Sequence, residues 1–184
     1  MVMAAGDRQR LGAALQDVAD EYASRLDAAG VAIDEVGGIE GITDLVRTVL
    51  PRPNRFTARV GPVYSTGQLT RLLPGADATP ISDEAVRDRQ RNGRLVGFKA
   101  ADGRWAWPAW QFRMAPGRLV PRADVIALWR LLPRDGPSDL MRIAWMTGAH
   151  DGLDAQSPLT WLDRHGLDDR LHRAAARWAG RTAA

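Results

Sequence analysis

Apolar residues recur every three or four positions along the first 50 residues of the chain. Between residues 7 and 29 the recurring apolar positions are Leu11, Ala14, Leu15, Val18, Tyr22, Leu26 and Ala29. This spacing predicts an amphipathic helix that ends at Gly30. A second helix is predicted over residues 39–50, ended by Pro51, with apolar positions Ile39, Ile42, Leu45, Val46 and Val49. Residues 1–51 therefore predict a helical hairpin, whose apolar stripe either covers the rest of the protein or pairs with a second copy of itself.

Two short helices are predicted in the middle of the chain. Ser65 or Thr66 can cap the first over residues 67–73, and its apolar stripe is Leu69, Leu72 and Leu73. Pro74-Gly75 ends that helix. The second covers residues 82–92, because Ser82 is a favourable N-cap, Asp83 and Glu84 suit a first turn, and Asn92-Gly93 supplies a left-handed end.

A β-hairpin is predicted directly after the second of these helices. Two extended runs cover residues 94–99 and 104–107, Asp102-Gly103 is a strong turn signal between them, and Pro108 ends the second. A helix followed by a two-stranded ribbon is the layout of a winged helix-turn-helix, in which the helix enters the major groove of DNA. Trp105, Trp107 and Trp110 could stack on bases, but alternating aromatic residues beside a proline more often pack a small sheet against helices.

The last third of the chain predicts only helices. The first begins at Pro121 and runs through Leu132, with Val125, Leu128, Trp129 and Leu132 on one side. Ser138 caps the next, which runs to about Thr147 and should be the most buried of this half. Ser157-Pro158 starts a short helix. Asp168-Asp169 opens the last one, in which Leu171, Ala174, Ala175 and Trp178 face inward and Arg170, Arg173, Arg177 and Arg181 face largely outward.

These elements predict a mainly α fold with a small β-hairpin wing. The predicted parts are an N-terminal helical hairpin over 1–51, a winged helix-turn-helix-like domain over 60–113 and a C-terminal helical domain over 119–184. With 45% hydrophobic and 26% charged residues, the composition is that of a globular protein. No cysteine is present, so disulfides and thiolate metal sites are excluded and a reducing cytoplasm is expected.

Charge is unevenly distributed along the chain. Residues 1–51 carry four arginines and nine acids, a balance of −5, so the remainder carries +8. Acids at Asp7, Asp17, Asp20 and Glu21 argue against a signal peptide, and no apolar run of about 20 residues is present to span a bilayer. A cytoplasmic protein without a membrane partner is therefore expected. Residues 82–113 hold seven basic residues and four acids, a modest excess for a surface that neutralises phosphate.

The stretch YSTGQLTRLL…ISDEAVRDRQRNGRLVGF…GRWAWP resembles the excisionase and MerR-type winged helix over residues 63–108. Arg89 and Gln90 depart from that pattern, since they stand where the family usually buries an aromatic and an aliphatic residue. The resemblance implies DNA binding. The candidate DNA-binding residues are Arg87, Gln90, Arg91, Arg94, Lys99 and Arg104.

The turn Leu153-Asp154-Ala155-Gln156-Ser157-Pro158-Leu159 and the helix after it resemble the toxin-binding domain of the Xre/MbcA/ParS antitoxins, with Ala155 where glycine is usual. The resemblance covers roughly the last third of the chain. It implies an antitoxin that neutralises a RES-type toxin, an enzyme that degrades NAD, by covering the toxin's active site. Guanidinium groups and an aromatic plane near the C-terminus would suit such a site, although spaced arginines are more often a solvated face. The candidate toxin-binding residues are Trp161, Arg173, Arg177, Trp178 and Arg181.

Catalysis is not expected of this chain. Its histidines are His150, His165 and His172, and none has a metal-binding spacing or a neighbouring nucleophile. Neither a Walker loop nor a dinucleotide-binding glycine pattern occurs, so no cofactor or metal is predicted. The sequence thus favours an antitoxin with a RES-type toxin as partner, with operator DNA as a second partner, and working as a homo-oligomer or a complex with the toxin. The alternative is a DNA-binding regulator of the winged-helix class without a toxin partner.

Overall fold

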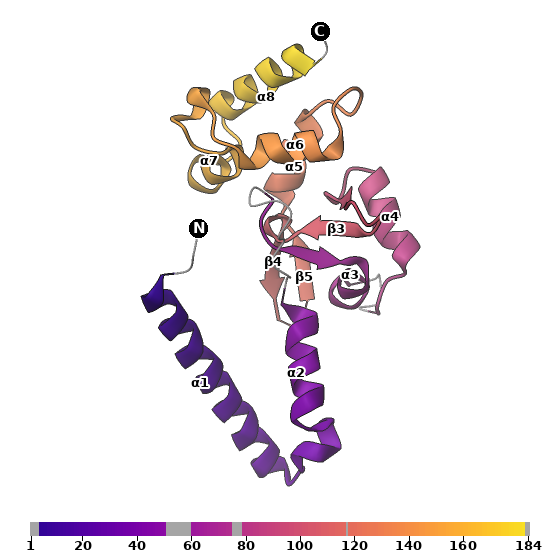
Figure 1. Ribbon diagram of the computed structural model, residues 1–184, viewed down its shortest axis with the longest axis vertical. Helices are drawn as coiled ribbons and strands as arrows, with labels where there is room; N and C mark the ends of the chain where they lie inside the picture. The colour runs from indigo at the N-terminus through magenta and orange to yellow at the C-terminus, as the bar shows by residue number, and fades with distance from the viewer. Residues whose placement is uncertain (1–3, 51–59, 75–78, 117, 183–184) are drawn as a thin grey trace. The chain divides into compact units, whose positions relative to one another are not determined.

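The computed structural model describes residues 4–50, 60–74, 79–116 and 118–182. The protein is mainly helical with small antiparallel sheets (Figure 1). Its chain divides into two compact units, Met1–Thr48 and Val49–Ala184. Pro51 and Gly75, two predicted helix ends, lie outside the described residues.

The N-terminal unit consists of the predicted helical hairpin. Helix α1 (Ala5–Ala29) ends at Gly30, whose φ of 65° is left-handed as predicted. An unpredicted 3-10 turn, η1 (Ile33–Val36), then leads into α2 (Gly38–Val49). The two helices border an apolar groove of about 530 Å³, lined by residues such as Leu15, Tyr22 and Val46. None of the described side chains of this unit is buried.

A three-stranded sheet and two helices begin the second unit. Strand β1 (Val63–Ser65) leads into α3 (Thr66–Leu72), α4 (Asp83–Arg91), β2 (Phe98–Lys99) and β3 (Trp105–Pro108). The strand order is β1-β3-β2 and both pairings are antiparallel. Ser65 and Ser82 cap α3 and α4 as predicted, by accepting hydrogen bonds from the amides of Gln68 and Ala85. The predicted run 94–99 is strand only at Phe98–Lys99, and β1 was not predicted because three residues are too few for an alternating pattern.

The rest of the second unit adds a hairpin and four α-helices. Strands β4 (Phe112–Ala115) and β5 (Arg118–Pro121) form an antiparallel hairpin that was not predicted. The helices are α5 (Ala123–Leu131), α6 (Asp139–Thr147), α7 (Pro158–His165) and α8 (Asp169–Thr182), with a 3-10 turn, η3 (Asp151–Leu153), before α7. The predicted helices are therefore confirmed. Helix α6 has the fewest exposed residues of the four, Leu140 and Met141, which agrees with the prediction that it is the most buried of this half.

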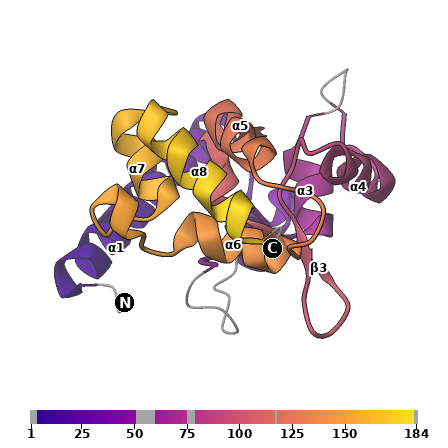
Figure 2. The same ribbon diagram turned by 90° about the horizontal axis from the view of Figure 1, so that it is seen from above.

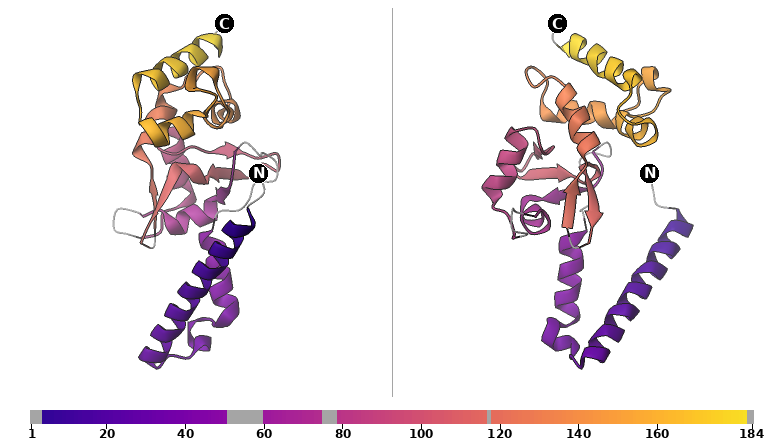
Figure 3. Two further views of the ribbon diagram at one scale, coloured as in Figure 1. Left: turned by 90° about the vertical axis from the view of Figure 1, so that its left-hand side faces the viewer. Right: turned by 180° about the vertical axis from the view of Figure 1, so that it is seen from behind.

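Two hydrophobic clusters share the strand β3. The larger contains the inward side chains of α5 to α8 together with Val96, Phe98 and Ala106. The smaller contains Trp107 and the leucines of α3. Strands β1 and β3 lie between the C-terminal helices and α3 (Figures 1 and 3). The predicted parts 60–113 and 119–184 thus contribute to one core and belong to one compact unit.

The three central tryptophans pack the fold, in agreement with the structural alternative. Trp107 is fully buried, and its Nε1 donates to Thr66 Oγ1 over 3.1 Å. Trp105 stacks on it with ring centroids 5.4 Å apart. Trp110 packs against the larger cluster and donates to the Val60 carbonyl.

Gln111 joins Val96 to the end of β3 from inside the protein. It is fully buried in the 3-10 turn η2 (Ala109–Gln111). Its Oε1 accepts from the Val96 amide over 2.7 Å, while its Nε2 donates to the carbonyls of Val96 and Pro108 over 2.6 and 3.0 Å. All three hydrogen bonds are shielded from water. The Gln111 side chain therefore satisfies backbone groups that a neighbouring strand would otherwise satisfy.

Candidate functional site

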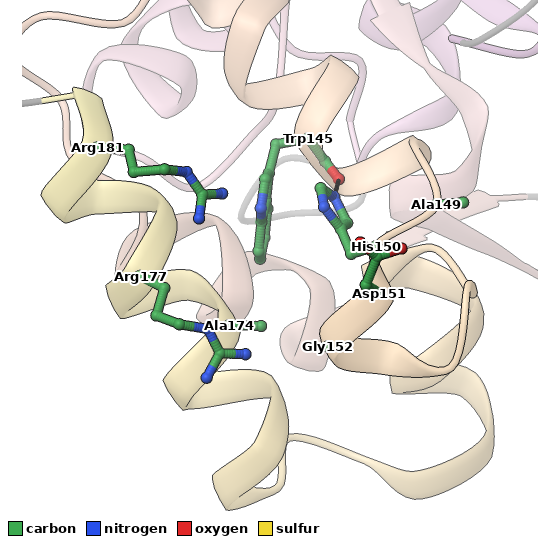
Figure 4. A pocket seen from close by; sticks show the side chains of 8 residues that line it. All are labelled: Trp145, Ala149, His150, Asp151, Gly152, Ala174, Arg177 and Arg181. Carbon is green, nitrogen blue, oxygen red and sulfur yellow. Dashed lines mark hydrogen bonds between the residues drawn. The ribbon is translucent and has the colours of Figure 1, made fainter.

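A polar pocket of about 420 Å³ lies beside the C-terminal helix. Its lining comes from α6, from η3 and the residues before it, and from α8, and consists of Trp145, Ala149, His150, Asp151, Gly152, Ala174, Arg177 and Arg181. Figure 4 shows the guanidinium groups of Arg177 and Arg181 on one side and the Trp145 ring between α8 and His150. Figure 2 shows α8 crossing over the other C-terminal helices. We call this pocket, with the exposed arginines of α8, the α8 arginine face.

Helical spacing and one glycine place the two arginines. Arg177 and Arg181 are four residues apart, so both lie on the same side of α8. A Cβ added at Gly152 would lie 2.6 Å from Arg177 Nη2, so a side chain at position 152 would displace that guanidinium group from η3. Neither arginine has an ion pair within the described part of the chain.

His150 closes the other side of the pocket. Its Nε2 lies 2.8 Å from the Trp145 carbonyl oxygen, and the two rings are 5.3 Å apart. Because a carbonyl oxygen only accepts, Nε2 carries the proton in this hydrogen bond. The pocket thus holds two arginines and one acid, Asp151, a balance that suits a carboxylate or phosphate group of a ligand.

The candidate toxin-binding residues divide between surface and core. Arg173, Arg177 and Arg181 are exposed. Trp161 and Trp178, in contrast, are only 5% and 9% exposed. The Trp178 ring packs 5.7 Å from the Trp145 ring, and Trp161 Nε1 donates to Asp168 over 3.1 Å. The two tryptophans are therefore core residues and do not form part of the candidate contact surface.

Arg170, which sequence reasoning placed largely outward, instead holds the turn before α7. Its Nε donates to the Gly152 carbonyl over 2.7 Å, and its Nη1 and Nη2 contact both carboxylate oxygens of Asp154. Its guanidinium carbon also lies 4.6 Å from the centre of the Trp161 ring. One side chain thus fixes the turn to α8.

The turn itself is left-handed at two non-glycine residues. Asp154 and Ala155 have φ values of 52° and 57°. We expect Ala155→Gly to raise the free energy of unfolding by about 0.5–1 kcal/mol, because an L side chain is strained in this region. Ala149→Gly is the control, since residue 149 has no positive φ and glycine there should lower stability. Thermal unfolding of both variants measures this, and a destabilised Ala155→Gly would contradict it.

Asp168 caps α8 and makes stability depend on pH. The Leu171 amide donates to its Oδ1 over 2.8 Å, and this bond, helped by the one from Trp161, lowers the pKa of the Asp168 carboxyl. A lowered pKa contributes stability above the ordinary Asp value of about 4, and this stability is lost as pH falls through the folded-state pKa. Asp168→Ala should cost about 1 kcal/mol at pH 7.

The matched variant is Asp168→Asn, which keeps a capping oxygen but cannot ionise. We expect the stability difference between the wild type and Asp168→Asn to shrink when urea denaturation is repeated below pH 4. A difference that stays constant with pH would show that the Asp168 charge does not contribute to stability.

The candidate DNA-binding residues lie along α4 and the β2–β3 hairpin, but most are already paired. Arg91 donates to Glu84 over 2.7 Å and to Asp88, and Glu84 raises the pKa of Arg91. Arg87 lies 3.8 and 3.9 Å from Asp83 and Glu84. Much of the positive charge of α4 is therefore compensated by acids on the same helix.

The other candidates differ in how accessible they are. Gln90 is half-buried and donates to Asp139 on α6 over 3.2 Å. Arg94, Lys99 and Arg104 are exposed. Arg104 lies 3.8 Å from Asp102, and the Lys99 ammonium lies 6.0 Å from the Trp105 ring. Arg89 donates to the Pro74 carbonyl, so a hydrogen bond stands where the winged-helix pattern has apolar packing.

Among the described residues, no group of three or more His, Asp or Glu side chains is arranged to hold a metal ion. No described helix combines the length and apolar character needed to cross a membrane. Comparison of the chain with protein-family models, with curated proteins and with solved structures found no match.

Proposed function

We propose that this protein is a cytoplasmic antitoxin that binds and blocks a RES-type toxin through the α8 arginine face. The observation that carries the proposal is the pair Arg177 and Arg181, which share a concave pocket and have no ion pair among the described residues. Exposed, unpaired guanidinium groups beside an aromatic ring bind carboxylates and phosphates strongly when a partner excludes water. An acidic side chain of the toxin is the ligand that fits this pocket.

The arrangement also supports recognition by a preformed surface. Arg170, Asp168 and the left-handed turn fix η3 against α8, so the pocket does not have to be ordered on binding. Pre-ordering reduces the entropy lost in the complex and strengthens binding. The buried Trp161 and Trp178 contribute to binding indirectly, because they hold α8 in place.

The test uses the full chain and a RES-like enzyme encoded next to it. Co-purification measures binding, and NAD breakdown measures inhibition. We expect Arg177→Glu combined with Arg181→Glu to weaken binding by about a hundredfold or more, because two charge-assisted contacts become repulsive. Arg113→Glu, on an exposed residue of β4, is the control and should bind normally. If the wild type does not bind, or the double variant inhibits equally well, the proposal is rejected.

DNA binding is the second candidate function. The protein would either bind DNA in addition to a toxin, or be a DNA-binding regulator that has no toxin partner. The order β1-α3-α4-β2-β3 favours a winged helix-turn-helix layout, with exposed Arg94, Lys99 and Arg104 at or near the β2–β3 hairpin. A mobility shift on the native promoter tests this over a range of salt concentrations. Removing one phosphate contact should reduce the salt slope by about 0.9. Unchanged affinity and slope in Arg94→Ala and Arg104→Ala would reject it.

A further inference from the structure

A second, smaller polar pocket lies where α4 meets α5 and α6. Its volume is about 170 Å³, and Arg91, Gly93, Arg134 and Arg142 are among its lining residues. The pocket is separate from the α8 arginine face, since the two share no lining residue. We call it the Gly93 pocket.

Arg142 brings a buried positive charge to this pocket. It is only 5% exposed, and its guanidinium carbon lies 3.6 Å from the centre of the Trp129 ring. Its Nη1 donates to Asp139 over 3.1 Å and its Nη2 to the Trp129 carbonyl over 3.0 Å. Its Nε has no hydrogen-bond partner in the described part of the chain. Burial lowers the pKa of Arg142, as expected for a charge that is only partly compensated.

Arg134 adds a second positive charge beside Gly93. One of its terminal nitrogens lies so close to Gly93 that a side chain at position 93 would displace it. The Gly93 carbonyl is held by Arg130 Nε over 3.0 Å, so the backbone under Arg134 is fixed. Among the described residues Arg134 has no ion pair.

The acids near the Gly93 pocket do not balance its arginines. Asp139 is the acid among the lining residues, and its carboxylate is shared between Arg142 and Gln90. Arg91 is paired with Glu84 and Asp88, which do not line the pocket. Arg134 and Arg142 therefore share one carboxylate, Asp139, and the pocket carries a small local excess of positive charge.

We propose that the Gly93 pocket binds a phosphate group. The pocket is smaller than the several hundred Å³ typical of sites for drug-sized ligands, but a single oxyanion fits it. A tetrahedral phosphate presents oxygens in several directions and can accept from more than one guanidinium group at once, whereas a carboxylate is satisfied by one bidentate arginine. The phosphate belongs either to a free small molecule or to the backbone of a nucleic acid, and both offer the same chemistry.

The experiment titrates inorganic phosphate into the full-length protein and follows the arginine Nε–H signals by NMR. Sodium chloride at matched ionic strength is the reference. We expect saturable shifts of the Arg134 and Arg142 signals with phosphate only, and Arg134→Gln should weaken binding by about tenfold or more, because a charge-assisted hydrogen bond is lost. Arg113→Gln should bind as the wild type does. Arg142→Lys, which keeps the charge but not the planar group, should also bind more weakly.

Three outcomes would overturn the proposal: no saturable shift, equal shifts with chloride, or unchanged affinity in Arg134→Gln. Arg134 is exposed, so its variant should fold even if Arg142→Lys does not. A short DNA duplex added to the phosphate-bound protein identifies the source. Competition for the same signals assigns the pocket to backbone phosphate, and independent binding assigns it to a free phosphate compound.

Discussion

Gln111→Ala is expected to lower the free energy of unfolding of the Val49–Ala184 unit by about 3–5 kcal/mol. The substitution leaves the Val96 amide and two carbonyls buried without partners, and each unsatisfied group costs about 1–3 kcal/mol. The empty volume left by the fully buried side chain adds to this loss. Chemical denaturation followed by tryptophan fluorescence measures the change.

Two further variants separate the causes of that loss. Gln111→Met keeps most of the volume but none of the hydrogen bonds, so it should recover only the part due to the cavity. Gln156→Ala removes a half-buried glutamine whose side chain accepts from Arg164, and it should cost at most about 1 kcal/mol. A loss below 1 kcal/mol for Gln111→Ala would show that the three hydrogen bonds are replaceable by water.

The second large effect is expected at Gly97, where alanine should destabilise the same unit by about 3 kcal/mol. A Cβ there would lie 2.5 and 2.6 Å from two carbons of the Trp107 ring. That ring is fully buried, stacked on Trp105 and bonded to Thr66, so it cannot move aside without repacking the core. The φ of Gly97 is not left-handed, which leaves lack of space as the reason for glycine.

Gly67→Ala is the matched control for this prediction. Gly67 lies in α3, and a Cβ at this position meets nothing within 4 Å. Alanine there should stabilise the protein by about 0.5–1 kcal/mol, because glycine is a poor helix former. Thermal unfolding of the two alanine variants should give shifts of opposite sign, and shifts of the same sign would contradict the steric account.

The features predicted correctly are those whose signal is local. Ser65, Ser82, Ser138 and Ser157 each accept a hydrogen bond from the amide three residues later, as their positions before apolar stripes indicated. An N-cap needs only its own helix, so a few residues of sequence are enough to find it. The glycine ends at Gly30 and Gly93 were predictable for the same reason.

The features that were missed depend on residues distant in the sequence. Gln111 contacts Val96 15 positions away, and Gln90 contacts Asp139 49 positions away. Nothing in either local pattern identifies the partner. Strands β4 and β5 were missed because residues 112–121 do not alternate cleanly between apolar and polar positions.

The candidate site shows how two sequence signals can conflict. Arg173, Arg177 and Arg181 were predicted to face outward and do so. Trp178 was included with them because an aromatic plane beside guanidinium groups would suit the active site of an NAD-degrading toxin. Its spacing with Leu171, Ala174 and Ala175 already placed it in the inward stripe of α8, and this periodicity was the more reliable signal. The assembly of Arg177 with Trp145 and His150 into one pocket required the fold.

Strand β3 contributes residues to both hydrophobic clusters of the second unit, so it can link the stability of one cluster to that of the other. Adjacent residues Ala106 and Trp107 belong to different hydrophobic clusters, so opening of either cluster is expected to loosen the packing of this strand. A ligand held by α8 would then slow amide hydrogen exchange in β1 and α3 as well as in its own surroundings. Because such coupling is reciprocal, DNA or phosphate bound near α4 would also raise the affinity of α8 for its ligand, provided that local opening of the core limits that affinity.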